Sequence, residues 1–342
     1  PRLRELMMSR GRLLLTGATG MVGMALTPRL IEEGYDLSVM LRPSSDRSTL
    51  AGQNVRVVEA DLADPQTLGP ALANIDYVVH AAAHVGDWGP AEKYRERNVV
   101  ALEHMLTASR NQVHRWVQVS SLGVYSAQDH FGTDESTPPD IAGLDGYTRT
   151  KAEAEVLLNR HIQEHALPAV ILRPGFIYGP GDRHVLPRII KKFEAGTMRM
   201  IGDGQKYLNN TSVDNLVDAI VLGLQHPDVV GETFNIRDKR LVTRQEYVST
   251  IAEYLDLPYP RTVPAPIARL LVVFVEGWAK LRAATEAPFL TRASIKFMDQ
   301  NLDYSIDKAI RMLGYEPRDD FQPVMHRALE WARSTGQISK GA

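Results

Sequence analysis

The sequence predicts an α/β fold: a doubly wound parallel sheet between two layers of helices, with a small C-terminal lobe. Short runs that are apolar on both faces alternate with helical segments through the first half of the chain. Such runs are typical of parallel strands that helices bury from both sides. The turn after the first run carries Gly17, Gly20 and Gly23, and beyond about Gly175 prolines and glycines break the alternation. This break predicts where the second lobe begins.

The alternation also predicts the individual elements. Helices are expected at 21–33, 92–110 and 213–225, with a further one through 147–151. Residues 11–174 should form the main domain, to which 205–237 return, while 175–204 and 238–335 should form the lobe. The expected strands are 12–16, 36–42, 55–60, 75–82, 115–120, 169–173 and 232–236.

Length, charge and cysteine content exclude several classes of protein. The 342 residues suffice for a large core. The net charge of −2 lacks the basic surplus of a nucleic-acid binder, so no nucleic-acid partner is expected. The chain has no cysteine, which excludes disulfides and thiolate metal sites. The absence of cysteine is compatible with the cytoplasm, where we expect the protein to be found.

The glycine turn predicts a dinucleotide site. Glycines allow a tight turn and the close approach of a pyrophosphate, and the following helix offers N–H donors and the positive end of its dipole. The spacing G-x-x-G-x-x-G differs by one residue from the G-x-G-x-x-G fingerprint, but it has the same strand–turn–helix setting. The residues expected to contact the cofactor here are Gly17, Thr19, Gly20, Met21, Val22 and Gly23.

The end of the second strand favours NADP over NAD. An acidic residue there would bind the ribose 2′-OH, but this chain has Arg42 followed by serines. A guanidinium with nearby hydroxyls suits a 2′-phosphate, although Arg42 could instead stack on the adenine. Further cofactor contacts are expected after the third strand, at Asp61 and Leu62, and after the fourth, at Ala81, Ala82 and Ala83.

Tyr147 and Lys151 carry the predicted chemistry. Four residues apart on a helix, they share a face, so the ammonium can favour the ionised phenol. A free tyrosine, with a pKa of about 10, is a poor base at neutral pH, and a nearby cation corrects this. Because Y-x-x-x-K also occurs by chance, the prediction depends on the motifs around it.

Taken together, these motifs resemble those of the extended short-chain dehydrogenase/reductases, which have a Rossmann domain. The resemblance covers residues 12–335 and is greatest to the 3β-hydroxysteroid and sterol-4-carboxylate dehydrogenase branch. It rests on the glycine turn, Asp61-Leu62, His80-Ala81-Ala82-Ala83, Ser120-Ser121-Leu122-Gly123-Val124-Tyr125, Tyr147-x-x-x-Lys151 and Arg173-Pro174-Gly175-Phe176-Ile177-Tyr178-Gly179-Pro180.

The resemblance implies a role for each matching residue. Tyr147 would exchange a proton with the substrate oxygen. Lys151 would lower the pKa of Tyr147 and hold the nicotinamide ribose. Ser121 would hydrogen-bond the reacting oxygen, with Ser120 structural. Asn98 would take part in catalysis by fixing a kinked helix and a water path towards Lys151. Pro174 and Ile177 would lie at the nicotinamide. The chain departs from the family at Tyr125-Ser126, where glycine is usual.

An apolar substrate is the favoured interpretation. Leu208 occupies the position where nucleotide-sugar members have a phosphate-binding arginine, although Lys206 could partly compensate. His84 and Trp88 follow the fourth strand, where substrate loops lie, and Arg183 could meet a carboxylate or carbonyl. We therefore expect a steroid-like secondary alcohol or ketone. The alternatives are a nucleotide-sugar or hopanoid-associated sugar epimerase, a long-chain 2-alkyl-3-oxoalkanoate reductase, or a non-catalytic dinucleotide sensor.

The remaining predictions concern partners. The apolar helix at 267–281, with Leu270, Leu271, Phe274 and Trp278, is expected to be buried or to roof a cavity, and peripheral membrane contact is not favoured. The family resemblance implies a homodimer through paired helices. No metal is expected, because His161-x-x-Glu164-His165 resembles a zinc motif but has no evident third ligand.

Overall fold

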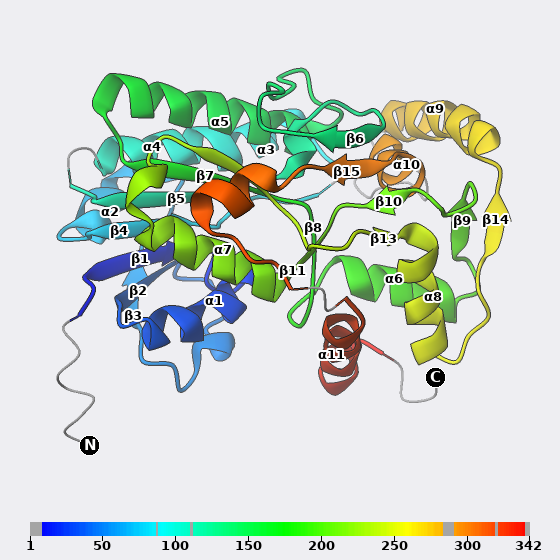
Figure 1. The fold of residues 1–342 in the computed structure, drawn as a ribbon, viewed down its shortest axis with the longest axis horizontal. Helices are drawn as coiled ribbons and strands as arrows, with labels where there is room; N and C mark the ends of the chain where they lie inside the picture. The colour runs from blue at the N-terminus through cyan, green and yellow to red at the C-terminus, as the bar shows by residue number, and fades with distance from the viewer. Residues whose placement is uncertain (1–8, 87, 110–111, 283–290, 319–320, 339–342) are drawn as a thin grey trace.

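The computed structural model describes residues 9–86, 88–109, 112–282, 291–318 and 321–338 (Figure 1). Its centre is a seven-stranded sheet in the order β3-β2-β1-β4-β5-β7-β12, and every neighbouring pair is parallel. The order reverses between β1 and β4, as in doubly wound dinucleotide-binding sheets. The strands are β1 (Arg12–Thr16), β2 (Asp36–Leu41), β3 (Arg56–Glu59), β4 (Tyr77–His80), β5 (Arg115–Val119), β7 (Ala169–Pro174) and β12 (Thr233–Ile236).

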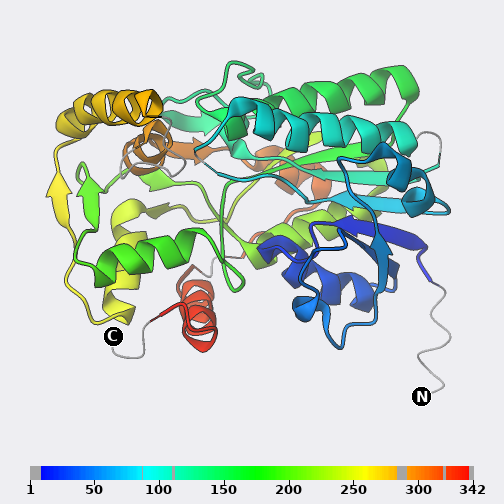
Figure 2. The same cartoon turned by 180° about the vertical axis from the view of Figure 1, so that it is seen from behind.

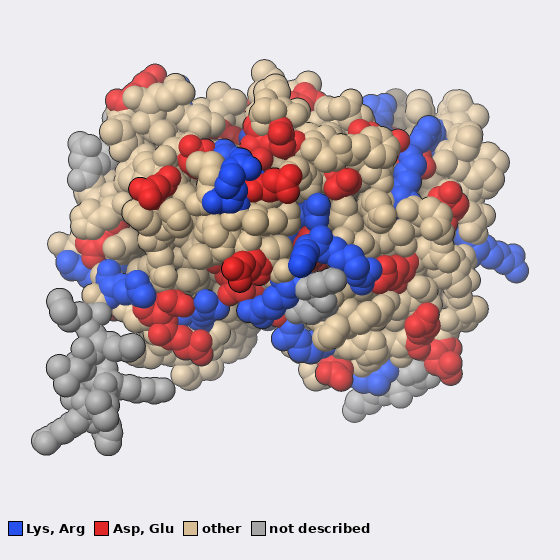
Figure 3. All heavy atoms as spheres, in the orientation of Figure 1, with Lys and Arg blue, Asp and Glu red and all other residues tan. Residues whose placement is uncertain are grey.

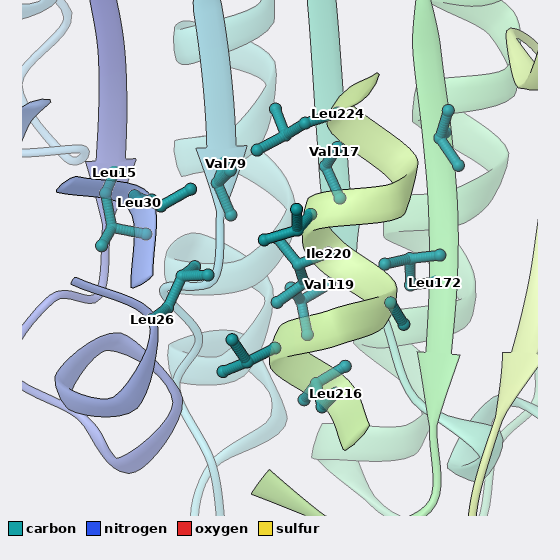
Figure 4. Close-up of a cluster of buried hydrophobic side chains, with 14 of the residues drawn as sticks. Leu15, Leu26, Leu30, Val79, Val117, Val119, Leu172, Leu216, Ile220 and Leu224 are labelled. Atoms are coloured by element: carbon teal, nitrogen blue, oxygen red, sulfur yellow. The ribbon is translucent and has the colours of Figure 1, made fainter. Parts of the chain in front are cut away.

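Helices cover both faces of this sheet (Figures 1 and 2). Alternate residues of β1 point to opposite sides, so Leu13 and Leu15 join one buried cluster and Leu14 joins the other. One face is covered by α1 (Met21–Glu32) and α7 (Val213–Gln225), whose leucines meet the strands in Figure 4. The other is covered by α2 (Pro65–Leu72), α3 (Ala91–Arg95), the π-helix η2 (Glu96–Val100), α4 (Ala101–Ala108) and α5 (Gly146–His165).

The C-terminal lobe has its own buried core, which includes Leu208, Tyr247 and Phe321. Its two-stranded pairs are β11 with β8, β10 with β13, β14 with β9, and β15 with β6. The strands are β6 (His130–Thr133), β8 (Phe176–Tyr178), β9 (Arg199–Ile201), β10 (Tyr207–Leu208), β11 (Asn210–Ser212), β13 (Val242–Thr243), β14 (Arg261–Val263) and β15 (Leu302–Tyr304). The helices are α6 (Val185–Glu194), α8 (Arg244–Tyr254), α9 (Ala265–Leu281), α10 (Arg292–Asp299) and α11 (Phe321–Ser334).

Short helical turns complete the structure: η1 (Ser48–Leu50), η3 (Leu122–Val124), η4 (Pro227–Val229) and η5 (Ala309–Leu313). The predicted fold class is confirmed, and each predicted strand overlaps an observed one. The predicted end of one helix, Arg110, lies outside the described residues. The predicted domain limits stay a prediction, although β12 does join the large sheet while β10 pairs within the lobe.

Helix α9 departs from the prediction that it is buried. Leu270, Leu271, Phe274 and Trp278 are all exposed, whereas the smaller Ala268 is buried. The prediction that these four side chains roof a cavity is therefore wrong, because they point outward from the lobe. Within the described part of the chain, none of the helices is long and apolar enough to span a bilayer.

Candidate active site

The glycine turn lies where β1 and β4 end side by side, the point at which the strand order reverses. Gly17 has a φ of +76°, and a Cβ there would lie 2.8 Å from the amide nitrogen of Ala82. A Cβ at Gly23 would lie 2.2 Å from the carbonyl oxygen of Gly17. The protein itself therefore requires glycine at both positions, to pack the turn against β4 and against the start of α1.

Gly20 differs, because the protein leaves space beside it. A Cβ there would meet only the carbonyl oxygen of Gly17, at 3.4 Å, and the residue is exposed. No side chain caps the N-terminus of α1, so its first N–H groups remain available to an anion. An open glycine over an uncapped helix terminus fits a pyrophosphate.

Thr16 and His80 join the two strand ends. The Oγ1 of Thr16 lies 3.0 Å from Nδ1 of His80 and accepts a hydrogen bond of 3.2 Å from the amide of Ala82. Burial, reinforced by the positive charge of Lys151, lowers the pKa of His80 to about 3. The imidazole is therefore neutral at physiological pH, and this link holds the Ala81–Ala82 loop beside Gly17.

The adenosine side of the site carries two exposed arginines. Arg42 follows β2, and its side chain makes no hydrogen bond or ion pair with the described residues. Arg183 was expected at the substrate, but its guanidinium lies 4.0 Å from the sulfur of Met24 on α1. Ser48 is the main cause of the lowered pKa of Asp46, and Arg183 lowers it further. Arg183 thus lies beside the helix that follows the glycine turn, and its contact with a substrate stays a prediction.

The other predicted nucleotide contacts lie at the ends of neighbouring strands. Asp61 is partly buried, and its Oδ1 accepts a hydrogen bond of 3.0 Å from the amide of Ala63 in its own loop. Pro174 ends β7 and is buried, and Ile177 lies partly buried on β8. Their contacts with a cofactor stay predictions.

Helix α5 positions the predicted catalytic pair. A capping box starts the helix, in which the side chain of Asp145 accepts from the amide of Thr148 at 2.8 Å. Lys151, one turn after Tyr147, is buried, and its Nζ donates a hydrogen bond of 2.6 Å to the carbonyl oxygen of Val119 at the end of β5. Ser121 follows β5 closely, and its hydroxyl is near enough to Tyr147 to lower the pKa of that phenol. The structure thus brings Ser121, Tyr147 and Lys151 together.

The protonation states differ from those predicted. Burial raises the pKa of Tyr147 to about 12, while the hydrogen bond with Ser121 lowers it and the charge of Asp145 raises it. The sequence predicted a lowered pKa for Tyr147, but the protein groups around it raise this pKa. Loss of solvent around the phenolate outweighs the effect of Ser121. Burial lowers the pKa of Lys151 to about 8, and Glu155 opposes that shift. At neutral pH the phenol is protonated and the amine is charged.

Glu155, one turn beyond Lys151, belongs to a buried charge network that sequence reasoning missed. Its carboxylate accepts hydrogen bonds from Arg173 at 2.6 Å and from the hydroxyl of Ser120 at 2.5 Å. Arg173 also donates to the phenol of Tyr125 at 2.7 Å. The spacing of Tyr147, Lys151 and Glu155 at i, i+4 and i+8 could have revealed the network, since all three share one helix face.

Asn98 lies in the π-helix η2, between α3 and α4. Its side-chain amide donates to the carbonyl of His84 and to the hydroxyl of Thr150, both at 3.1 Å, and its Oδ1 accepts from the amide of His84 at 2.7 Å. Asn98 therefore ties the loop after β4 to helix α5, beside Lys151. A catalytic role for Asn98 stays a prediction.

The predicted substrate residues fall into two groups. The ring of His84 packs on Tyr94 at 4.8 Å between centroids, and the carbonyl of Trp88 accepts from the hydroxyl of Tyr94 at 3.0 Å. Both lie in the loop after β4. Leu208, by contrast, is fully buried in the lobe core. The predicted substrate contact of Leu208 is wrong for this structure, because its side chain has no exposed surface to offer.

The zinc-like motif places its two histidines side by side on α5. The rings of His161 and His165 contact each other edge to face, with 5.1 Å between their centroids, and His161 is buried. Among the residues that the structure describes, no three His, Cys, Asp or Glu side chains are grouped so that they could hold a metal ion.

Comparison with known proteins identifies the class to which this site belongs. The model of the NAD dependent epimerase/dehydratase family matches residues 13–236, and the chain belongs to this family. The chain is therefore an NAD-dependent enzyme, an oxidoreductase that acts on CH–OH groups.

Individual relatives carry the names that the resemblance predicted. A 2-alkyl-3-oxoalkanoate reductase of Stenotrophomonas maltophilia is 29% identical over 92% of this chain and 98% of its own length. A decarboxylating sterol-4-alpha-carboxylate 3-dehydrogenase of Candida albicans is 28% identical over 93% of this chain and 96% of its own. These relatives confirm the predicted branch of the extended short-chain dehydrogenase/reductases.

Solved structures are similar over almost the whole chain. The crystal structure of gox2253 has a TM-score of 0.82 and 27% identity, covering 96% of this chain and all of its own. A structure of MoeE5 in complex with UDP-glucuronic acid and NAD has a TM-score of 0.74 and 26% identity, covering 95% of this chain and 100% of its own.

Proposed function

We propose that this enzyme interconverts a secondary alcohol and a ketone on a bulky apolar substrate, with Ser121, Tyr147 and Lys151 as its catalytic residues. The single observation that carries the proposal is their convergence at the end of β5, two strands from the glycine turn. A nicotinamide cofactor, when bound, supplies or accepts the hydride at its C4 atom.

The protonation states support a separate role for each of these residues. The phenol of Tyr147, with a pKa of about 12, retains its proton and donates it to the oxygen of a ketone being reduced. Ser121 donates a hydrogen bond to the same oxygen and so stabilises its developing negative charge. The ammonium of Lys151 stabilises the phenolate that remains, and in the oxidative direction the proton returns to Tyr147.

NADP is the preferred cofactor in this proposal. Arg42 is exposed and unpaired among the described residues, and Arg183 lies beside Met24 of α1 and acts on the charge of Asp46 in the loop after β2. Two guanidinium groups suit the dianionic 2′-phosphate of NADP, whereas NAD has only hydroxyls there. Support for NADP therefore comes from two chain segments rather than one.

The apolar substrate is inferred from the relatives and from the loop after β4. The relatives named above act on a 2-alkyl-3-oxoalkanoate and on a sterol carboxylate, both largely apolar. Trp88 and the contacting rings of His84 and Tyr94 offer aromatic surface in the loop that Asn98 holds. Leu208 stands where nucleotide-sugar enzymes have a phosphate-binding arginine. Because Leu208 is buried in the lobe core, this difference supports an apolar substrate less strongly than the sequence suggested.

A sugar epimerase is the second candidate, supported by the complex of MoeE5 with UDP-glucuronic acid. Lys206 was a possible substitute for the missing arginine. Its Nζ instead donates to the carboxylate of Asp129 at 3.1 Å on the surface of the lobe. A diphosphate would have to compete with this carboxylate, which disfavours a nucleotide sugar.

Turnover with defined compounds tests the proposal. Purified protein with NADPH or NADH is offered steroid ketones, 2-alkyl-3-oxoacyl esters and UDP-sugars, while loss of reduced nicotinamide is followed by absorbance. The proposal predicts net oxidation of the cofactor with an apolar ketone. Epimerisation of a UDP-sugar without net cofactor consumption would overturn it in favour of the second candidate.

We also propose a homodimer through α4 and α5. A hollow of about 600 Å³ runs along these helices, lined by Val99, Leu157 and charged residues of both signs. Val156 and Ile141, at its rim, are exposed apolar residues. Replacing Val156 by Asp should shift the sedimenting species from dimer to monomer, and an unchanged mass would refute this interface.

A further inference from the structure

Helix α9 has the reverse of an ordinary amphipathic pattern. It turns small or charged residues inward: Ala268, Val272, Glu276 and Ala279 are buried at intervals of three or four positions. It turns its large apolar residues outward, with Leu270 exposed by 64%, Phe274 by 68% and Trp278 by 58%. A surface helix normally packs its largest apolar side chains on the core, so this outward face fits an apolar partner.

The inner face is fixed to the lobe by ion pairs. The carboxylate of Glu276 accepts a hydrogen bond of 2.6 Å from the amide of Arg292, and Arg269 pairs with the buried Asp299 at 2.5 Å. These contacts hold α9 against α10 in one orientation. Because its opposite face is held against α10, the apolar face of α9 points away from the lobe. The helix lies at a corner of the lobe in both Figure 1 and Figure 2.

The segment that contains α9 is rich in basic residues. In sequence, residues 261–282 hold four basic residues and one acid, Glu276, although the whole chain has a net charge of −2. Arg261 and Arg282 are exposed, and Arg269 pairs with Asp299. The one acid is buried in its ion pair. Figure 3 shows uncharged surface beside Lys and Arg side chains at the corner of the lobe where α9 lies. An apolar face within a basic border is complementary to an anionic surface with an apolar interior.

Trp278 and Arg282 add a feature of the membrane interface. The guanidinium of Arg282 lies 3.6 Å from the centroid of the exposed Trp278 ring. Tryptophan favours the headgroup level of a bilayer, where its ring is in apolar surroundings and its N–H is near water. An arginine stacked on it would meet lipid phosphates at the same depth.

We propose that α9 lies in the headgroup region of an anionic lipid bilayer, with Leu270, Phe274 and Trp278 inserted between the acyl chains. The helix runs parallel to the surface and does not cross it. A two-fold contact between copies of the chain fits less well, because it would place the same arginines of both copies against each other. The proposal is independent of the substrate, since docking requires neither turnover nor cofactor.

Flotation with lipid vesicles tests the proposal. The full chain is mixed with vesicles of phosphatidylcholine alone or with added phosphatidylglycerol, and bound protein is separated on a density gradient. We expect binding to the anionic vesicles that weakens as salt is raised. The double variant Leu270→Ser/Phe274→Ser should bind at least tenfold more weakly. Failure of the wild-type protein to float with anionic vesicles would overturn the proposal.

A matched control removes two apolar side chains elsewhere. Val230 and Ile310 are also exposed, by 46% and 48%, so Val230→Ser/Ile310→Ser removes exposed apolar surface away from α9 and should bind like the wild type. Equal weakening by both double variants would contradict a site on α9. If the double variant on α9 melts at a lower temperature, Trp278→Ser carries the same test.

Two further measurements identify the partner. Brominated lipids should quench the emission of the wild-type protein more strongly than that of Trp278→Phe, and equal quenching would contradict insertion of this ring. Arg282→Glu should weaken binding to anionic vesicles several-fold and leave the weak binding to phosphatidylcholine unchanged. A concentration-dependent oligomer that is lost in Leu270→Ser/Phe274→Ser, without any vesicle binding, would assign the face to a second copy instead.

Discussion

Helices α5 and α9 differ in which side chains they bury. On α5, Lys151 and Glu155 are buried charges, held by the carbonyl of Val119 and by Arg173. On α9, the large apolar residues are exposed and small ones are buried. Each helix departs from the rule that charges face water and apolar groups face the core. Such departures are expected at functional sites, where a buried charge or an exposed apolar face has a use.

The two departures have different costs. Burying a charge requires a network of partners, and α5 supplies one through Ser120, Arg173 and Tyr125. Exposing an apolar face requires no partner within the chain. Substitutions on α5 should therefore affect stability and chemistry together, whereas those on the outer face of α9 should affect neither. The following predictions test this contrast, in order of expected effect.

The largest effect is expected for Tyr147→Phe. Removing the phenolic hydroxyl removes the proton donor, and kcat should fall by roughly 10²–10⁴-fold. Binding of NADPH, measured by fluorescence titration, should be nearly unchanged because the ring remains. Tyr207→Phe, at an exposed tyrosine of the lobe, is the control and should retain full activity. Turnover of Tyr147→Phe at the wild-type rate would rule out its role in proton transfer.

Glu155→Gln should be the most destabilising substitution on α5. It leaves the buried Arg173 without its carboxylate, at a cost of about 3–5 kcal/mol in the free energy of unfolding. Chemical denaturation measures this cost. The control is Glu153→Gln, which removes a partly exposed pair with Arg149 and should cost about 1 kcal/mol or less. If the two variants lost similar amounts of unfolding free energy, burial of the ion pair would not explain the destabilisation.

Glu155→Gln also tests the pH dependence. The pKa of Lys151 is about 8 in the folded chain and higher when it is unfolded, so activity should decline as pH rises through about 8. The free energy of unfolding should rise over the same range and up to about 10.4, since only the unfolded chain still holds that proton. Glu155 favours the ammonium. Glu155→Gln should therefore move the decline in activity to lower pH, and a shift to higher pH would contradict the network.

Two leucines compare the helices directly. Leu158 on α5 is fully buried, so Leu158→Ala should lower the free energy of unfolding by about 2–5 kcal/mol. Leu270 on α9 is exposed, so Leu270→Ala should change it by about 0.5 kcal/mol or less. Thermal melting of both variants without lipid provides the measurement. A large loss from Leu270→Ala would mean that its side chain supports the fold.

Among the effects on activity, the smallest is expected at the nucleotide site. Arg42→Asp should shift the ratio of kcat/KM for NADPH to that for NADH by about tenfold or more towards NADH, because a charge-assisted hydrogen bond is lost. Arg183→Ala should shift the ratio in the same direction if it faces the same phosphate. A ratio that neither substitution alters would refute the preference for NADP.

The sequence alone predicted the parts of the molecule that are governed by local pattern. Strands such as Arg12–Thr16 were predicted because parallel strands are apolar on both faces. The combination of Tyr147 and Lys151 on one helix face followed from helical geometry. The order of the strands and the bond from Lys151 to Val119 could not be predicted, because both depend on how distant segments pack.

The failed predictions have a common physical cause. Leu208 and the α9 leucines are all apolar, and composition does not say which apolar residue a fold will bury. Residues 270–275 are apolar in succession, so periodicity could not distinguish the inner face from the outer one. The raised pKa of Tyr147 was missed because spacing locates a cation but not the burial that opposes it.

Transfer of deuterium tests the central claim most directly, namely that Tyr147 and Lys151 serve net hydride transfer to a ketone. The wild-type enzyme and Tyr147→Phe are incubated with NADPH deuterated at C4 and an apolar ketone, and the product is examined by mass spectrometry. The account predicts an alcohol carrying one deuterium at the carbinol carbon from the wild-type enzyme, formed far more slowly by the variant. An alcohol without deuterium, or equal labelling rates in the two proteins, would contradict it.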